Sequence, residues 1–511
     1  NNTAVGYNAL TANTTGTQNV AVGTGALDSN TTASNNTAVG HQAMYSNVTG
    51  TFNAALGHEA LYNNTGSNNT GLGYQAGRAN TSGENNVYVG KWSGRSGTTG
   101  SRNIGIGNET FESSNTGSDN IAVGHQALTA NTSGAQNTAL GSLALDANTT
   151  GTTNTAIGFD AQTVSTTSVS NTCVGNVAGQ ALTTGSYNVF VGSGAGDAQT
   201  TANSNVGIGN GALTSNVTSE GCVAVGGEAL QMNTATNNTA VGFQALEENT
   251  TGSMNTAAGF KALDACTTGV NNVAVGSNAL DNLTTGNNNI GVGRSAGGTA
   301  SSTSNLTCVG HYAGSAATGN GNTFIGYSAG DACTTGVNNV CVGENADVGS
   351  GNGSHRITIG VGLVDAGDNT FAFGKSSNRV YNVFTSNASW TRDSDVRLKK
   401  DIQANTDLGL DFINDLRTVT YKWKAPSELD SSLADYDASK TEADYTPKMY
   451  GFIAQEVKQA LDDHNITDFN GWHIADESAD QIQGISYEMF VMPLVKAVQE
   501  LSAKVAALEA N

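Results

Sequence analysis

The chain has 511 residues and a formal net charge of −21, with 12% charged residues and 65 glycines. An acidic chain without a basic stripe argues against nucleic acid and anionic membranes as partners. No run of 18 apolar residues is present, so we expect no membrane insertion. The chain begins at Asn1, inside a repeat and without methionine, so we expect a fragment or a processed product.

Composition divides the chain into parts. The first 374 residues hold 61 glycines, no proline and only 27 charged residues, whereas the remainder holds all three prolines and three of the four tryptophans. We predict a repeat shaft at 1–374, a connecting β-segment at 375–393 and a separate small domain at 394–511.

A glycine recurs along the shaft and closes a short phrase, first seen at 2–6 as Asn-Thr-Ala-Val-Gly. There are 23 such glycines from Gly6 to Gly374, and 18 of the 22 intervals between them are 17 residues. This period is too short for a helical hairpin and fits one coil of a β-solenoid. The predicted fold class is therefore mainly β, a parallel β-solenoid or β-roll of 17-residue coils.

Residues one and three positions before each glycine are apolar or threonine, and the residue between them is usually small, as in Val20, Ala21 and Val22. Alternate residues of a strand point to opposite faces, so both faces of this strand must be covered. One coil supplies only one covering. We therefore predict a homotrimer in which the small residues face the neighbouring chains.

Two further columns of the repeat leave alternatives open. Asparagine stands four residues before the glycine in 19 of 23 repeats, either as a hydrogen-bonded ladder along the rod or as a turn former. The residue after each glycine varies and includes His41, Tyr74 and Phe243. We expect it to fill a corner or an interchain groove; the alternatives are stacking on sugars and an ion held by histidines. No metal or cofactor is predicted.

The six cysteines occupy positions of small or buried residues in the repeat, as Cys173 does two residues before a glycine. No metal-ligand spacing is present. We therefore predict free, buried cysteines rather than disulfides.

Two stretches of sequence resemble known families. The repeat phrase resembles the head repeats of YadA-type trimeric adhesins, which implies a left-handed trimeric β-roll. Residues 394–402 (SDVRLKKDI), 450–457 (YGFIAQEV) and 487–508 are similar, in this order, to the peptidase S74 family, the C-terminal intramolecular chaperone of phage endosialidases and tail fibres. This resemblance implies a small α+β domain that drives trimerisation and sets the register.

The same resemblance implies chemistry at Ser394 and Lys399, with cleavage between Asp393 and Ser394. Serine is a weak nucleophile until a base takes its proton, and lysine acts as that base only when desolvation lowers its pKa. Burial at a trimer interface would supply this desolvation. Lys400 is the neighbouring alternative. The expected enzymatic activity is limited to this single-turnover serine endopeptidase step, with none in the repeats.

Apolar residues spaced by three or four positions near the C-terminus form a heptad seam: Leu494, Val498, Leu501, Val505 and Leu508. The seam predicts a coiled coil that gathers three chains. The alternative is an amphipathic helix packed on its own domain.

Together these features predict the shaft of a homotrimeric phage tail fibre or spike for host attachment, located in the virion and made in the host cytoplasm. The expected partners are two further copies and a host surface glycan or protein receptor. A trimeric cell-surface adhesin with the same cap is the alternative. A glycan-degrading tailspike is disfavoured, because no carboxylate pair stands out among the repeats.

Overall fold

The computed structural model contains two compact units, Asn1–Asp393 and Ser394–Asn511, and each is described by itself. The structure describes all residues except 366, 377, 386–390, 393–395, 397–398, 432, 434–435, 444–446, 475–482 and 511.

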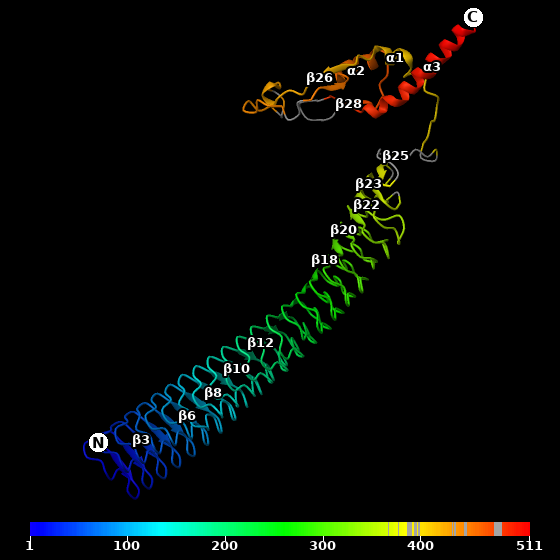
Figure 1. Ribbon diagram of the computed structural model, residues 1–511. Coiled ribbons are helices and arrows are strands. Elements are labelled where there is room, and N and C mark those ends of the chain that lie inside the picture. The colour runs from blue at the N-terminus through cyan, green and yellow to red at the C-terminus, as the bar shows by residue number, and fades with distance from the viewer. Residues whose placement is uncertain are drawn as a thin grey trace. The chain divides into compact units, whose positions relative to one another are not determined.

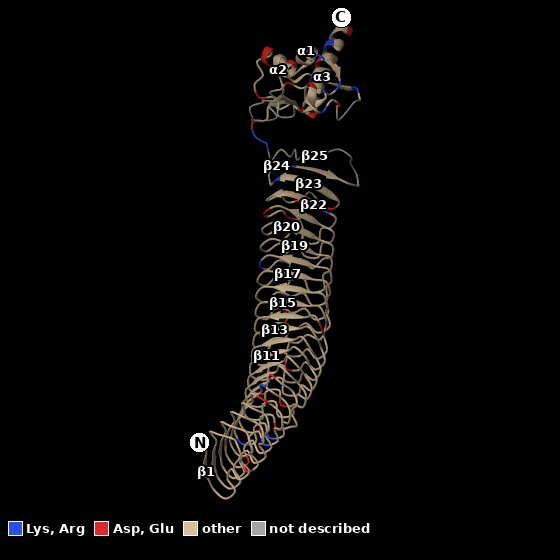
Figure 2. Cartoon of the chain, turned by 90° about the vertical axis from the view of Figure 1, so that its left-hand side faces the viewer, with Lys and Arg blue, Asp and Glu red and all other residues tan. Residues whose placement is uncertain are grey.

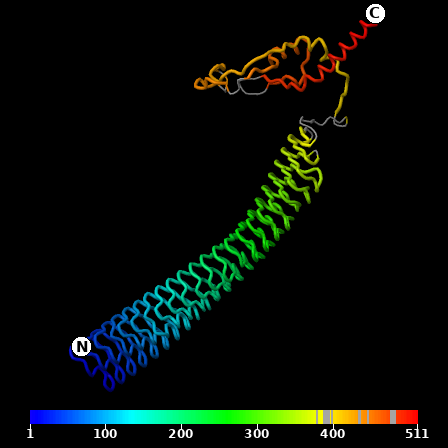
Figure 3. Tube along the Cα trace, in the orientation of Figure 1, coloured from blue at the N-terminus to red at the C-terminus, as the bar shows by residue number. Residues whose placement is uncertain are grey.

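The first unit is a β-solenoid of about 22 coils of roughly 17 residues, which confirms the predicted fold class (Figure 1). The Cα trace shows the chain winding as successive coils, each stacked on the one before (Figure 3). Charged residues are sparse along it (Figure 2). Each of the first 21 coils contributes one strand of three residues, and these strands are β1 (Thr3–Val5), β2 (Val20–Val22), β3 (Thr37–Val39), β4 (Ala54–Leu56), β5 (Thr70–Leu72), β6 (Val87–Val89), β7 (Ile104–Ile106), β8 (Ile121–Val123), β9 (Thr138–Leu140), β10 (Thr155–Ile157), β11 (Thr172–Val174), β12 (Val189–Val191), β13 (Val206–Ile208), β14 (Val223–Val225), β15 (Thr239–Val241), β16 (Thr256–Ala258), β17 (Val273–Val275), β18 (Ile290–Val292), β19 (Thr307–Val309), β20 (Thr323–Ile325) and β21 (Val340–Val342).

Strands β22 (Ile357–Val361), β23 (Thr370–Lys375), β24 (Asn378–Val383) and β25 (Thr391–Arg392) complete this unit. From β1 to β23 each strand pairs in parallel with the next, and equivalent positions of the repeat lie opposite each other, as Ala4 and Ala21 do. At β23 the pattern changes, because β24 returns antiparallel to it and β25 pairs antiparallel with β24.

The structure corrects the predicted orientation of the strands. The small middle residue points into the coil's own interior, where Ala21 is 0% exposed, whereas the flanking positions face outward, with Leu56 51% and Ile106 41% exposed. The physical reason is the narrowness of the coil, whose interior is already occupied by Ala26 and Leu27 from the next corner. The small residues therefore do not face neighbouring chains, and the β-branched residues do not form the core.

Three coils carry a large aromatic residue at this inward position, and each is compensated by a glycine. Tyr88, Phe190 and Phe324 are all buried. A Cβ on the glycine of the following corner would lie only 2.3 to 2.6 Å from the ring, as at Gly94 beside Tyr88 and at Gly330 beside Phe324. Most coils have leucine at that corner, so the interior exchanges one large side chain for another and stays closely packed.

Asparagine forms a ladder along the coils, which confirms that prediction and adds the backbone to it. The backbone N–H of Asn36 donates to Oδ1 of Asn19 (3.0 Å), and Nδ2 of Asn36 donates to the carbonyl of Gly50 in the next coil (2.8 Å). A second buried column does the same, with Nδ2 of Asn30 donating to Oδ1 of Asn13 (2.9 Å). Each such bond contributes ~1 kcal/mol, and losing one partner inside the coil would cost more.

All six cysteines are free and buried, as predicted. Burial raises the pKa of the Cys173 thiol to about 12. Cys222 takes a position of the asparagine ladder, where its backbone N–H donates to Oδ1 of Asn205 (2.8 Å). These cysteines therefore act as small apolar residues of the coil interior.

The second unit is a small α+β fold around one apolar cluster. The cluster contains Phe412, Val457, Leu461 and Phe490. No helix among the described residues is long and apolar enough to cross a membrane. The elements are α1 (Leu410–Asp415), β26 (Val419–Tyr421), the 3-10 turn η2 (Pro426–Glu428), β27 (Met449–Gly451), α2 (Ala454–Asp463), β28 (Trp472–Ile474), β29 (Gln483–Ile485), the 3-10 turn η3 (Tyr487–Phe490) and α3 (Val491–Glu509), with antiparallel pairs β26–β27 and β28–β29.

The repeat glycine is required by two constraints at once. All 23 glycines have φ between 128° and 149°, a region that other residues rarely adopt. A Cβ on Gly209 would lie 2.3 Å from the carbonyl oxygen of Gly226 in the next coil. The coils can therefore approach this closely only where neither carries a side chain.

We predict that Gly209→Ala lowers the free energy of unfolding by about 3 kcal/mol or more, because the methyl group pushes two coils apart. Gly211→Ala is the matched control. Gly211 also has a positive φ of 65°, but the nearest atom to its Cβ is 3.4 Å away, so the expected loss is only about 1 kcal/mol. Thermal unfolding of both variants measures the difference, and equal losses would contradict this account of the glycine column.

Candidate functional site

The predicted cleavage site is only partly described by the structure. Asp393 and Ser394 lie outside the described residues, so their geometry relative to Lys399 is not part of the observed site. Lys399 and Lys400 are described, and both are exposed. The backbone N–H of Lys399 donates to the carbonyl of Val396 (3.1 Å). The single chain thus leaves the lysine in water, where it lacks the desolvation that a general base requires.

The terminal helix α3 packs on its own domain and still leaves its seam uncovered. Pro493 and Ala497 are buried on the face of the helix toward α1, and the backbone N–H of Leu410 donates to Oε2 of Glu500 (2.8 Å). The predicted seam residues lie on another face and are all exposed, from 44% at Val505 to 76% at Leu508. The alternative of packing on its own domain therefore accounts for α3 without using the seam.

The phrase at 450–457 forms the junction between β27 and α2. Glu456, in the first turn of α2, forms an ion pair with Arg417, and hydrogen bonds from this guanidinium lower the pKa of the carboxyl group. The pair joins the segment after α1 to the start of α2. Glu456 therefore has a structural contact that agrees with its having been assigned no catalytic role.

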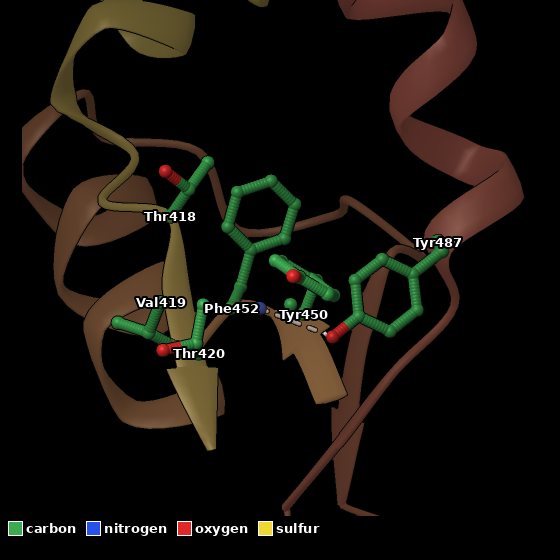
Figure 4. Close-up of a pocket in the computed structure, with 7 residues that line it drawn as sticks. Thr418, Val419, Thr420, Tyr450, Phe452 and Tyr487 are labelled. Atoms are coloured by element: carbon green, nitrogen blue, oxygen red, sulfur yellow. Dashed lines mark hydrogen bonds between the residues drawn. The ribbon is translucent and has the colours of Figure 1, made fainter. Parts of the chain in front are cut away.

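A pocket of about 550 Å³ opens beside this junction, and sequence patterns did not point to it. Residues of β26, β27 and η3 line it, and Figure 4 shows the ring of Phe452 beside that of Tyr487. The backbone N–H of Phe452 donates to Oη of Tyr487 (3.1 Å). A Cβ on Gly451 would lie 2.2 Å from the same oxygen, so only glycine fits there. The lining offers hydroxyl groups and aromatic rings but no carboxylate, imidazole or thiol, so it suits packing or binding rather than acid–base chemistry.

A second candidate surface runs along the shaft. We call the residues one and three positions before each repeat glycine the outward strand face. None of these positions carries a charged residue in any repeat. The face extends over all stacked strands, far beyond the few hundred Å² of contiguous apolar surface usual on a monomer. Its most exposed members are Val5, Leu56, Leu72, Ile104, Ile106, Ile121, Leu140, Ile208, Val241, Val275, Ile290, Ile325, Ile359 and Phe373.

The column after each glycine is exposed in many coils, and its rings stack along the shaft. His41 and His58 lie with ring centroids 5.0 Å apart, His58 and Tyr74 5.2 Å apart, and Phe243 and Phe260 6.0 Å apart. Within the described part of the chain, no three His, Cys, Asp or Glu side chains are grouped so that they could hold a metal ion.

Comparison with known proteins bears on the second unit. Residues 394–466 match the model of the peptidase S74 family, described as chaperone of endosialidase. The search of curated proteins and the search of solved structures found no match to the chain. The matched segment contains Lys399 and the junction of β27 with α2, and it ends before α3. The chain thus joins a β-solenoid of 17-residue repeats to a C-terminal chaperone-of-endosialidase segment, a combination that fits a tail-fibre or endosialidase-type protein.

Proposed function

We propose that this chain is the shaft of a homotrimeric phage fibre or spike that serves host attachment, and that residues 394–511 align and trimerise the three chains. The family match carries the coarser part, because a chaperone-of-endosialidase domain implies trimer formation in a fibre-like protein. The observation that carries the finer part is the outward strand face, an uncharged surface as long as the solenoid itself.

In this proposal the outward strand faces of three chains meet. Burying apolar surface contributes about 25 cal/mol per Å², so a partly exposed valine or isoleucine in each coil adds a modest amount. Many coils add these amounts, and the sum exceeds the cost of bringing three chains together. The same face left in water would favour unspecific aggregation, which gives the shaft a reason to assemble under control.

The terminal domain answers a problem that the repeat creates. Three shafts can pair almost as well when one is slipped by a whole repeat, because each coil presents nearly the same face. The exposed seam on α3 offers a unique contact that aligns the C-terminal ends before the coils associate. Association can then proceed along the shaft from a fixed start.

Cleavage before Ser394 would follow assembly. The Ser394 hydroxyl is the proposed nucleophile toward the Asp393 carbonyl, and Lys399 is the base that takes its proton. Lys399 is exposed in the single chain, so activation waits for the trimer to remove it from water. Loss of the chaperone would then slow unfolding by the reverse route, which is kinetic stability.

We predict that Leu501→Asp converts the full-length trimer into monomers, because a seam buried between three helices would trap unpaired carboxylates at a cost of several kcal/mol. Gln499→Asp adds the same charge to an exposed position of α3 outside the seam and should leave the trimer intact. Light scattering gives the molar mass of each. A trimer that tolerates Leu501→Asp as well as Gln499→Asp would contradict the proposed seam.

We also predict that the full-length wild type is cut into a shaft fragment and a C-terminal fragment, whereas Ser394→Ala remains at 51.9 kDa. Lys399→Met should block the cut, and Lys400→Met should allow it. Mass spectrometry of the denatured chains, taken after the trimer has formed, checks all four proteins. A trimeric wild type that stays whole, or a cleaved Ser394→Ala, would overturn the assignment.

A further inference from the structure

One short section of the shaft differs chemically from the rest. Residues 1–374 contain a single tryptophan and seven basic residues, and Trp92 lies with three of these basic residues in two consecutive coils. The whole of this segment carries 20 acidic residues, so a local excess of cations is unusual. We call this section the aromatic-cationic surface and define it as Tyr62, Tyr74, Arg78, Lys91, Trp92 and Arg95.

Printed contacts join these side chains into one surface. The Lys91 ammonium lies 3.7 Å from the centroid of the Trp92 ring, and the Arg95 guanidinium carbon lies 4.9 Å from the same centroid. The Arg78 guanidinium carbon lies 5.4 Å from the Tyr62 centroid in the neighbouring coils. A cation held over an aromatic face loses side-chain freedom, so these charges are positioned before any ligand arrives.

The basic side chains differ in how far they are neutralised. Arg78 donates to Oε2 of Glu59 (2.6 Å), and Arg95 lies 3.3 Å from Glu112. Burial raises the pKa of Glu59, but hydrogen bonds from Arg78 and Gln75 outweigh it and leave the pKa below its ordinary value. No described acidic side chain lies within ion-pair distance of Lys91, which is exposed. Lys91 is thus the cation on this surface that is ready for an anionic ligand.

An aromatic platform lies one coil away from this cation. Tyr74 and Lys91 take the same position of consecutive coils, directly after Gly73 and Gly90, and stacked coils are ~4.8 Å apart. Tyr74 is 45% exposed and stacks on His58 along the same column. The C–H groups of a pyranose ring carry partial positive charge and suit the negative face of such a ring.

We propose that the aromatic-cationic surface binds an acidic oligosaccharide, with a sugar ring packed on Tyr74 and its carboxylate paired with Lys91. Trp92 is a positioning residue that holds Lys91 in place. This inference rests on the proposed attachment function and gives the chemical class of its ligand. The strand positions that form the outward strand face are not part of this surface.

The repeat itself supplies variants that keep the coil intact. Tyr74→Ser and Lys91→Ser introduce the residue that stands at the same position as Ser142 and Ser193 in other coils. Trp92→Gln introduces the residue found at Gln75, which has the same left-handed backbone (φ 56° against 61°). Phe260→Ser is the control, since Phe260 is an exposed aromatic residue of the Tyr74 column in a distant coil.

The test applies the full-length protein to a glycan array that pairs carboxylated oligosaccharides with their neutral methyl esters. We expect binding of acidic members only, weakened by salt. Tyr74→Ser and Lys91→Ser should each lose at least about tenfold in affinity, the equivalent of one ion pair or stacking contact. Trp92→Gln should lose a smaller factor, most visible at raised salt. Phe260→Ser should bind as the wild type does.

Light scattering and thermal unfolding of every sample keep the two proposals separate. A folded trimer that binds no acidic glycan, or whose binding survives both Tyr74→Ser and Lys91→Ser, overturns this inference and leaves the assembly proposal standing. Equal binding of the methyl esters overturns the role of Lys91. A wild type that is monomeric contradicts the proposed assembly instead.

Discussion

The close stacking of one coil on the next is the constraint on which the rest of this molecule depends. A coil of 17 residues has too little interior to satisfy its own backbone, so its N–H and C=O groups must pair with the neighbouring coils. The glycine column permits the approach, as Gly209 and Gly226 show, and the asparagine ladder supplies partners where strands end. The result is a rigid rod whose shape follows from a single repeated phrase.

This economy inside the coil determines what remains outside. Because the interior accepts only small residues at the middle of each strand, the valine and isoleucine side chains that favour a strand must point outward. The outward strand face is therefore a consequence of the stacking and not a separate feature. A chain built in this way needs a partner for that face and needs control over how the partner is aligned, which is the proposed task of the terminal domain.

Sequence patterns predicted much of this fold and failed at identifiable points. The period identified the solenoid, and the seam of α3 was correctly recognised as a set of residues on one helical face. The orientation of the strands was wrong, because alternation shows that two faces differ but does not show which one is inside. Tyr88 and Phe324, each next to a corner glycine, carried the missing signal, since a large residue needs compensation only in a closed interior. The pocket at Phe452 and Tyr487 joins residues 35 positions apart, which no local pattern connects.

The central claim is that the outward strand faces of three chains meet along the shaft, and inter-chain cross-linking tests it most directly. Val241 lies on this face and is 44% exposed in the single chain, whereas Thr251 is exposed on an outer turn. The native cysteines are buried and leave the reaction to the introduced thiol. The account predicts that Val241→Cys gives disulfide-linked chains under mild oxidation and that Thr251→Cys does not. Cross-linking at Thr251→Cys alone would contradict it.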